Sequence, residues 1–291
     1  MYYDALRTFV TVADQQNFTK AATKLRISQP SVSLHIKNLE EEFQTELFIR
    51  RPKKLTITPT GEMLYDRAKQ ILAVYEQTRQ DILEHHQAVK GALKVGASFT
   101  IGEYIVPSLF MQMREKFPDL DLDLDIGNTA EVVQSVRRLN VDIGLIEGQT
   151  NDPELQIEPF MEDELFVVAS ASHPLAEKEE VEINDLHQET WIAREEGSGT
   201  RKYLDHVLRS NGLQSKSMIT ISSNQGVKES VIHGMGLSVL SKSVVERNVK
   251  HNDLAIITIK GHSFKRQFSC VYSPIMAKKR NVEAFMGMLY R

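Results

Sequence analysis

The chain of 291 residues contains a single cysteine, Cys270, and this scarcity limits the chemistry it can carry. One thiol cannot form an intramolecular disulfide or supply the cysteine cluster of a metal site. The chain also lacks an apolar run of the roughly 18 residues that span a bilayer. Its first residues lack the basic and apolar stretches of a secretion signal. We therefore expect a soluble, cytoplasmic protein with no membrane partner.

The sequence signals of enzymes and metal proteins are missing as well. There is no Gly-x-Ser-x-Gly nucleophile motif and no His-Glu-x-x-His zinc motif. His85 and His86 are adjacent, so on a helix they would point about 100° apart and could not chelate one ion. His233 and His251 have no partner at ligand spacing, and Cys270 lies in an apolar run that favours a buried, inert thiol. We expect no enzyme, no metal and no cofactor.

Charge is distributed unevenly along the chain. The net charge of −4 argues against nucleic-acid binding by the chain as a whole. Residues 1–60, however, carry nine Lys and Arg against six Asp and Glu, a net charge of +3, and the other 231 residues carry −7. This asymmetry suits a small basic module that binds nucleic acid and is joined to an acidic body.

Three short helices are predicted within the first sixty residues. Apolar residues recur at helical spacing from Leu6 to Ala13 and again from Phe18 to Leu25. Asn17 or Thr19 can cap the second helix. Ser28 is expected to cap the third helix, because proline follows in its first turn. The buried face of that helix is expected to hold Val32, Ile36, Leu39 and Phe43.

A hairpin and a long helix are predicted next. Apolar segments at 47–49 and 55–57 flank a basic turn and predict a β-hairpin, or wing. Thr58 and Pro59 then open a helix of about 28 residues, which at about 1.5 Å per residue is too long to lie on a 60-residue domain. The alternative is that this long amphipathic helix packs only on its own domain. The first interpretation is the one we follow for the predicted helix. Its heptad seam predicts dimerisation through Leu64, Ala68, Ile71, Tyr75, Thr78 and Ile82.

From Gly91 onward, strand patterns alternate with helical patterns. Strands are predicted at 93–96, 120–126, 141–146, 165–169, 191–193, 218–222 and 237–240. Helices are predicted near 103–116, at 129–139, from about 200, and near 225–233. This alternation predicts an α/β fold with a mainly parallel sheet and helices on both faces. The length fits two small lobes, although the sequence does not locate the crossing points between them.

The first sixty residues resemble the winged helix-turn-helix of LysR-type transcriptional regulators. The residues that carry this resemblance are Leu6–Ala13, Asn17–Ala22, Leu25, Ser28–Ser33, Ile36–Glu40, Leu47–Arg51 and Leu55–Gly61. The rest of the chain is similar to the effector domain of that family, which has two α/β lobes and resembles periplasmic binding proteins. The sparser motifs there are Val95–Ser98, Asp142–Ile146, His173–Leu175, Ser223-Asn224 and Gly234–Leu237.

The resemblance implies three domains and a set of partners. A winged helix-turn-helix is expected at 1–60, a linker helix for dimerisation at 59–88, and an effector-binding domain of two lobes at 92–291. The family implies a homodimer or homotetramer that binds double-stranded promoter DNA and responds to a small metabolite. RNA polymerase is a further candidate partner.

The third predicted helix carries the residues expected to contact DNA. Its exposed face is small and polar at the N-terminal end, which suits a major groove, whereas 40–42 are acidic and would repel the backbone. Gln29 can pair with an adenine edge, and Leu34 either contacts a thymine methyl or is an ordinary surface leucine. The basic wing turn either contacts phosphates or the minor groove, or is simply solvated. The candidates are Gln29, Pro30, Ser31, Ser33, Leu34, Lys37, Arg50, Arg51 and Lys53.

The segment 195–201, Glu-Glu-Gly-Ser-Gly-Thr-Arg, is the strongest local feature of the remaining chain. Backbone N–H groups at a helix start, with hydroxyls and a guanidinium, favour a small anion, although a capped turn uses the same residues. No nucleotide-binding ending is present, so ATP is not indicated. The resemblance implies effector binding between the lobes, and the Gly-Ser-Gly-Thr-Arg form is similar to regulators of carbon dioxide fixation and sulfite reduction. The candidates are Ser98, Thr100, Asn128, Thr129, Ser198, Thr200, Arg201 and Asn224.

Two functions remain open at this point. The chain can be a transcriptional regulator whose DNA binding is controlled by a small anionic metabolite. Alternatively, it can be an effector-independent DNA-binding protein whose C-terminal α/β domain serves only oligomerisation. Ligand-dependent heat or a ligand-dependent change in the DNA footprint distinguishes them.

Overall fold

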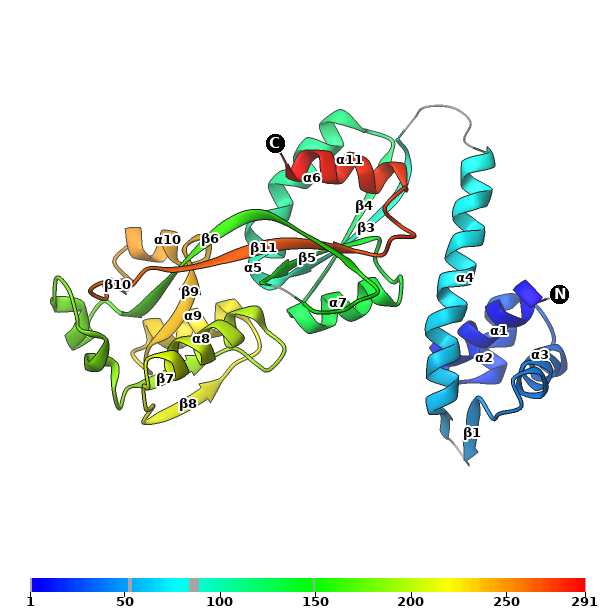
Figure 1. Ribbon diagram of the computed structural model, residues 1–291, viewed down its shortest axis with the longest axis horizontal. Helices are drawn as coiled ribbons and strands as arrows, with labels where there is room; N and C mark the ends of the chain where they lie inside the picture. Colours follow the sequence, from blue (N-terminus) through cyan, green and yellow to red (C-terminus); the bar gives the residue numbers. More distant parts are fainter. Residues whose placement is uncertain (1, 52–53, 84–88, 149, 291) are drawn as a thin grey trace. The chain divides into compact units, whose positions relative to one another are not determined.

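The structure is a computed structural model that describes residues 2–51, 54–83, 89–148 and 150–290. The chain divides into two compact units, Met1–Ala88 and Val89–Arg291 (Figure 1). Within the described ranges, no helix combines the length and the apolar character needed to cross a bilayer.

The first unit is a helical domain with a small hairpin. Its elements are α1 (Tyr2–Gln15), α2 (Phe18–Leu25), α3 (Gln29–Glu42), β1 (Phe48–Arg51), β2 (Lys54–Ile57) and α4 (Pro59–Leu83). The expected caps are confirmed, because Asn17 accepts a hydrogen bond from the Lys20 N–H and Ser28 accepts one from the Ser31 N–H. Thr58 caps α4 in the same way by accepting from the Gly61 N–H at 2.9 Å. Polar side chains therefore set where these helices begin.

One core holds the first unit together, and the prediction for Phe43 is wrong. Val32, Ile36 and Leu39 of α3 are buried against Phe9 of α1, as expected. Phe43 is 49% exposed because α3 ends at Glu42, and Phe43 is only its C-cap. Helical spacing placed Phe43 on the buried face, but the domain does not extend far enough to cover it.

The second unit contains a seven-stranded mixed sheet and a separate two-stranded sheet. Its strands are β3 (Gly91–Ser98), β4 (Leu120–Gly127), β5 (Ile143–Glu147), β6 (Gln156–Ser170), β7 (Thr190–Ala193), β8 (Ser217–Thr220), β9 (Ser238–Ser241), β10 (Leu254–Ile257) and β11 (Phe264–Tyr272). Its α-helices are α5 (Phe99–Tyr104), α6 (Val106–Lys116), α7 (Thr129–Arg137), α8 (Gly199–Ser210), α9 (Asn224–Ile232), α10 (Lys242–Lys250) and α11 (Arg280–Leu289). The large sheet has the order β10-β6-β11-β5-β3-β4, and β9 also pairs with β6.

The expectation of a mainly parallel sheet is wrong for the large sheet. Strand β3 runs parallel to β4 and β5, and β7 runs parallel to β8. Strands β6 and β11, however, pair antiparallel with each other and with their remaining neighbours. The hydropathy pattern indicated only 165–169 of β6, because the first half of this strand is largely polar.

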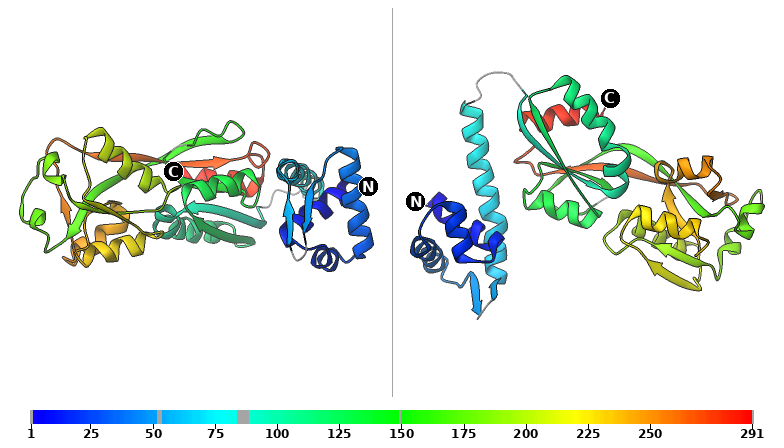
Figure 2. Two further views of the ribbon diagram at one scale, coloured as in Figure 1. Left: turned by 90° about the horizontal axis from the view of Figure 1, so that it is seen from below. Right: turned by 180° about the vertical axis from the view of Figure 1, so that it is seen from behind.

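Strands β6 and β11 connect two lobes, each with its own hydrophobic core (Figures 1 and 2). Lobe 1 contains β3–β5, α5–α7 and α11, and its core includes Phe268 and Phe285. Lobe 2 contains β7–β10 and α8–α10, and its core includes Trp191. The helix predicted near 103–116 is two helices, α5 and α6, because Pro107 lies in the first turn of a new helix.

Candidate functional site

The N-terminal end of α3 is exposed and rich in hydrogen-bonding groups. Gln29 and Pro30 are exposed, and Leu34 is 56% exposed. The Ser28 and Ser31 hydroxyls lie 2.8 Å apart, and the Gln29 Nε2 donates to the Ser33 Oγ at 3.2 Å. The groups predicted to contact base edges thus lie together on the first two turns of the helix.

The basic residues predicted to contact DNA near this helix end make contacts within the first unit. Lys37 forms an exposed ion pair with Glu41 at 3.4 Å. The Arg50 guanidinium lies 4.7 Å from the centre of the Phe18 ring and 4.0 Å from Glu40. Exposed ion pairs contribute little and exchange readily, so these charges remain accessible to phosphate.

The basic wing is described only in part. Arg51 is exposed at the end of β1, opposite Lys54. Lys53 lies outside the described residues, as do His85 and His86.

The predicted seam of α4 is half covered by its own unit. Ala68 is fully buried, and Leu64 packs against the same core. From Ile71 onward the seam is exposed, and Tyr75 also contacts the Tyr3 ring. A groove of about 530 Å³ follows this exposed half and is lined by Ile71, Val74, Tyr75, Thr78, Arg79 and Ile82. The first half of the seam therefore belongs to the domain core, and the second half is left uncovered by the described residues of the first unit.

Glu147 is at the centre of the residues predicted to bind the effector. It ends β5 in lobe 1 and is 4% exposed. Its Oε1 accepts a hydrogen bond from the Thr100 N–H at 3.1 Å, and its Oε2 accepts one from the Thr200 hydroxyl at 2.9 Å. The Arg266 Nη1 lies 2.7 Å from the same Oε2. Burial alone would raise the pKa of Glu147, but Arg266 and these hydrogen bonds outweigh burial and lower it.

Arg266 also contacts a second buried carboxylate. Its Nε donates to the Asp163 Oδ2 at 2.7 Å, and the Ser241 hydroxyl donates to the Asp163 Oδ1 at 2.6 Å. Burial raises the pKa of Asp163 despite the nearby guanidinium. One cation is thus shared between two buried acids, which is a costly arrangement away from water.

Asn224 and Arg194 form another contact between the lobes. Asn224 donates to the Thr100 hydroxyl at 3.2 Å and accepts from the Arg194 Nη1 at 2.5 Å. The Arg194 guanidinium lies 4.4 Å from the centre of the Phe99 ring. Its side chain is 1% exposed and pairs with Glu195 at 2.8 Å. A buried cation is thereby held at the boundary of the two lobes.

The other predicted effector residues differ in what they contact. Thr129 is buried and donates to the Glu147 carbonyl at 3.5 Å. Ser98 is buried, and its Oγ has no hydrogen-bond partner among the described residues. Ser198 is buried and caps α8. Thr100, Thr129, Thr200 and Asn224 thus meet around Glu147, directly or through one another.

Like Ser198, two further predicted residues hold the ends of helices or pair with neighbours. Asn128 caps α7 in a reciprocal capping box with Glu131. Arg201 is turned to Asp205, at 3.0 Å, and donates to the Arg194 carbonyl at 3.1 Å. Their side chains are therefore engaged in holding α7 and α8.

Sequence reasoning missed the charged residues of this cluster. Glu147 directly follows the predicted strand 141–146, and Arg194 precedes the Gly-Ser-Gly segment, so both had a positional signal. Asp163 and Arg266 had none, because they lie in parts of β6 and β11 that hydropathy did not reveal.

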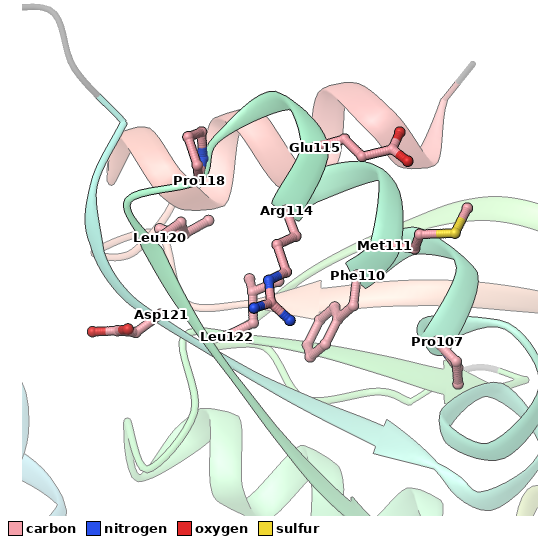
Figure 3. Close-up of a pocket in the computed structure, with 9 residues that line it drawn as sticks. All are labelled: Pro107, Phe110, Met111, Arg114, Glu115, Pro118, Leu120, Asp121 and Leu122. Carbon is pink, nitrogen blue, oxygen red and sulfur yellow. The ribbon is translucent and has the colours of Figure 1, made fainter.

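A separate pocket of about 710 Å³ lies in lobe 1 (Figure 3). It is lined from α6 and β4 by residues that include Phe110, Arg114 and Leu122. None of its lining residues belongs to the cluster around Glu147.

Comparison with known proteins places both units in one family. Residues 3–62 match the "Bacterial regulatory helix-turn-helix protein, lysR family", and residues 86–291 match the "LysR substrate binding domain". The chain is 60% identical to the HTH-type transcriptional regulator CysL of Bacillus subtilis over 289 residues, which cover 99% of this chain and 97% of that relative.

Two further proteins agree with this result. A "Probable RuBisCO transcriptional regulator" of Cyanidioschyzon merolae is 32% identical over 277 residues, covering 93% of this chain and 91% of that relative. The regulatory domain of Synechocystis PCC6803 CcmR, solved in complex with 2-PG, matches with a TM-score of 0.62 and 25% identity, covering 69% of this chain and 96% of that one.

The names of the relatives confirm the resemblance to regulators of carbon fixation, and they are names of transcriptional regulators, not of enzymes. Helix-turn-helix and effector-binding domains are both present, so the protein is a DNA-binding transcriptional regulator. The chain belongs to the LysR family.

Proposed function

We propose that this regulator binds promoter DNA as a dimer, with one α3 helix of each chain in the major groove. The support is the polar, exposed first turn of α3 and the exposed half of the α4 seam. Twofold symmetry gives a roughly palindromic site with half-sites about one helical turn or a multiple apart. Because promoter DNA is its partner, we place the protein in the cytoplasm. We also propose RNA polymerase as a further partner and a homotetramer as the larger assembly.

We assign the DNA contacts to the first turn of α3, to its exposed face and to the wing. Gln29 reads a base edge, Ser31 and Ser33 contact base or phosphate, and Leu34 meets a thymine methyl. Pro30 and Lys37 lie on the same DNA-facing side of the helix, and Arg50, Arg51 and Lys53 of the wing contact phosphates or the minor groove.

We further propose that a small anion bound between the lobes controls this DNA binding. The observation that carries this is a pair of buried guanidinium groups at the lobe boundary: Arg266 donates to the Thr200 hydroxyl, and Arg194 is linked to the Thr100 hydroxyl through Asn224. Charge-assisted hydrogen bonds of this kind favour anions. The CcmR domain, similar in fold and 25% identical, was solved with 2-PG.

Isothermal titration of the full chain tests the effector class. Phosphorylated sugars, sulfur oxyanions and carboxylates are titrated beside uncharged and aromatic ligands. Saturable heat from an anion supports the proposal, and heat only from an uncharged or aromatic ligand contradicts it. No heat from any ligand would favour the alternative in which the second unit serves only assembly.

A further inference from the structure

The carboxylate of Glu147 already occupies the donors that an anionic effector would use. Its two oxygens accept from the Thr100 N–H, the Thr200 hydroxyl and the Arg266 Nη1 at distances of 3.1, 2.9 and 2.7 Å. A backbone amide, a hydroxyl and a guanidinium are also the kinds of donor that bind a small anion. Glu147 is therefore bound as an internal anion would be.

This contact also joins the two lobes at close range. Glu147 ends β5 in lobe 1, and Thr200 lies in the first turn of α8 in lobe 2. A side chain at Gly199 would put its Cβ 2.5 Å from the Glu147 carbonyl oxygen, so this approach requires glycine. A second bond, from the Ala130 N–H to the Gly197 carbonyl at 3.2 Å, lies next to it.

At this position, replacing the Glu147 carboxylate by an effector anion is more favourable than binding the anion beside it, because of the charges present. Arg266 neutralises Glu147 and Asp163 together, so two buried carboxylates share one guanidinium. A further anion beside them would be repelled, since like charges a few ångströms apart interact strongly in a buried setting. Displacement of the Glu147 carboxylate would release the Arg266 Nη1 to the incoming anion, while the Arg266 Nε stays paired with Asp163. The Arg266 Nη2, a buried polar atom without a partner among the described residues, can add to its binding.

We propose that Glu147 is a latch between the lobes and that the acidic group of the effector binds by displacing its carboxylate. The proposal rests on the proposed anionic effector. It makes Glu147 the residue that sets the affinity for anions, because each bound anion must first release the contact to Thr200.

The variant Glu147→Gln tests this in the full chain, because it keeps the size of the side chain and removes the charge. Glu162→Gln is the matched control, since Glu162 is exposed on β6 and pairs at the surface with Lys265. Titration of 2-PG, inorganic sulfate and inorganic phosphate should show affinity about tenfold higher for Glu147→Gln than for the parent, a coupling of ordinary size. Glu162→Gln should match the parent. Equal or lower affinity in Glu147→Gln would overturn the proposal and leave the anionic effector intact.

A second readout requires no ligand. Amide hydrogen exchange in segments 98–102 and 199–202 should be faster in Glu147→Gln than in the parent and in Glu162→Gln, because release of the latch exposes both ends of the contact. Unchanged exchange there overturns the latch. If Glu147→Gln does not fold, Glu147→Asp serves instead, because its side chain is one methylene shorter and should hold Thr100 and Thr200 together less well. Heat from none of the anions in any variant would overturn the proposed effector class, and the exchange rates would still decide the latch.

Discussion

The exposed half of the α4 seam allows a quantitative prediction for Ile82. Ile82 is 73% exposed on α4 of the first unit. Full burial of an isoleucine side chain stabilises by about 1.5–3 kcal/mol, so about 1–2 kcal/mol remains to be gained in a dimer. A twofold interface uses the residue twice. Ile82→Ala should therefore weaken dimerisation by about 2–4 kcal/mol, or about 30- to 1,000-fold in Kd.

Sedimentation equilibrium over a range of protein concentrations measures this change. Met63→Ala is the matched control, because Met63 is 69% exposed on the same helix but lies off the seam. It should change the free energy of dimerisation by less than about 0.5 kcal/mol. The reasoning is refuted if Ile82→Ala associates like the parent, or if Met63→Ala weakens association equally.

Three further predictions concern DNA binding and the lone thiol. Arg51→Ala should weaken binding to all DNA sequences and flatten the plot of log affinity against log salt concentration by about one unit; an unchanged slope removes Arg51 from the phosphate contacts. Gln29→Ala should cost about 1–3 kcal/mol at the cognate site and relax its specificity, and equal loss on random DNA would show that Gln29 reads no base. Cys270 is fully buried, and burial raises the pKa of its thiol, so it stays protonated at neutral pH. A thiol reagent should label it only after unfolding, and rapid labelling of the folded chain would contradict this.

Local signals predicted the first unit well because its determinants are local. Ser28 and Thr58 accept hydrogen bonds from N–H groups three residues further on, so their identity alone marks a helix start. Phe43 shows the limit of this reasoning. Its spacing fits the buried face, but whether anything covers it depends on where the domain ends.

The second unit shows what a sequence pattern does not contain. Hydroxyls and an amide at probable helix starts predicted Thr100, Thr200 and Asn224, and the structure links these three through Glu147. Glu147 and Arg266 are 119 residues apart in the chain, and only the antiparallel pairing of β11 with β5 and β6 brings them into contact. Such register is a long-range property, so the charges that neutralise one another at this site could not be found by reading one segment at a time.

A DNase footprint of the full chain on its promoter, with and without a panel of small anions, tests the central claim most directly. The account predicts protection of two symmetric half-sites about one helical turn or a multiple apart, and a change in that protection when one of the anions is added. Absence of protection at low salt, or protection that no anion alters, would contradict it.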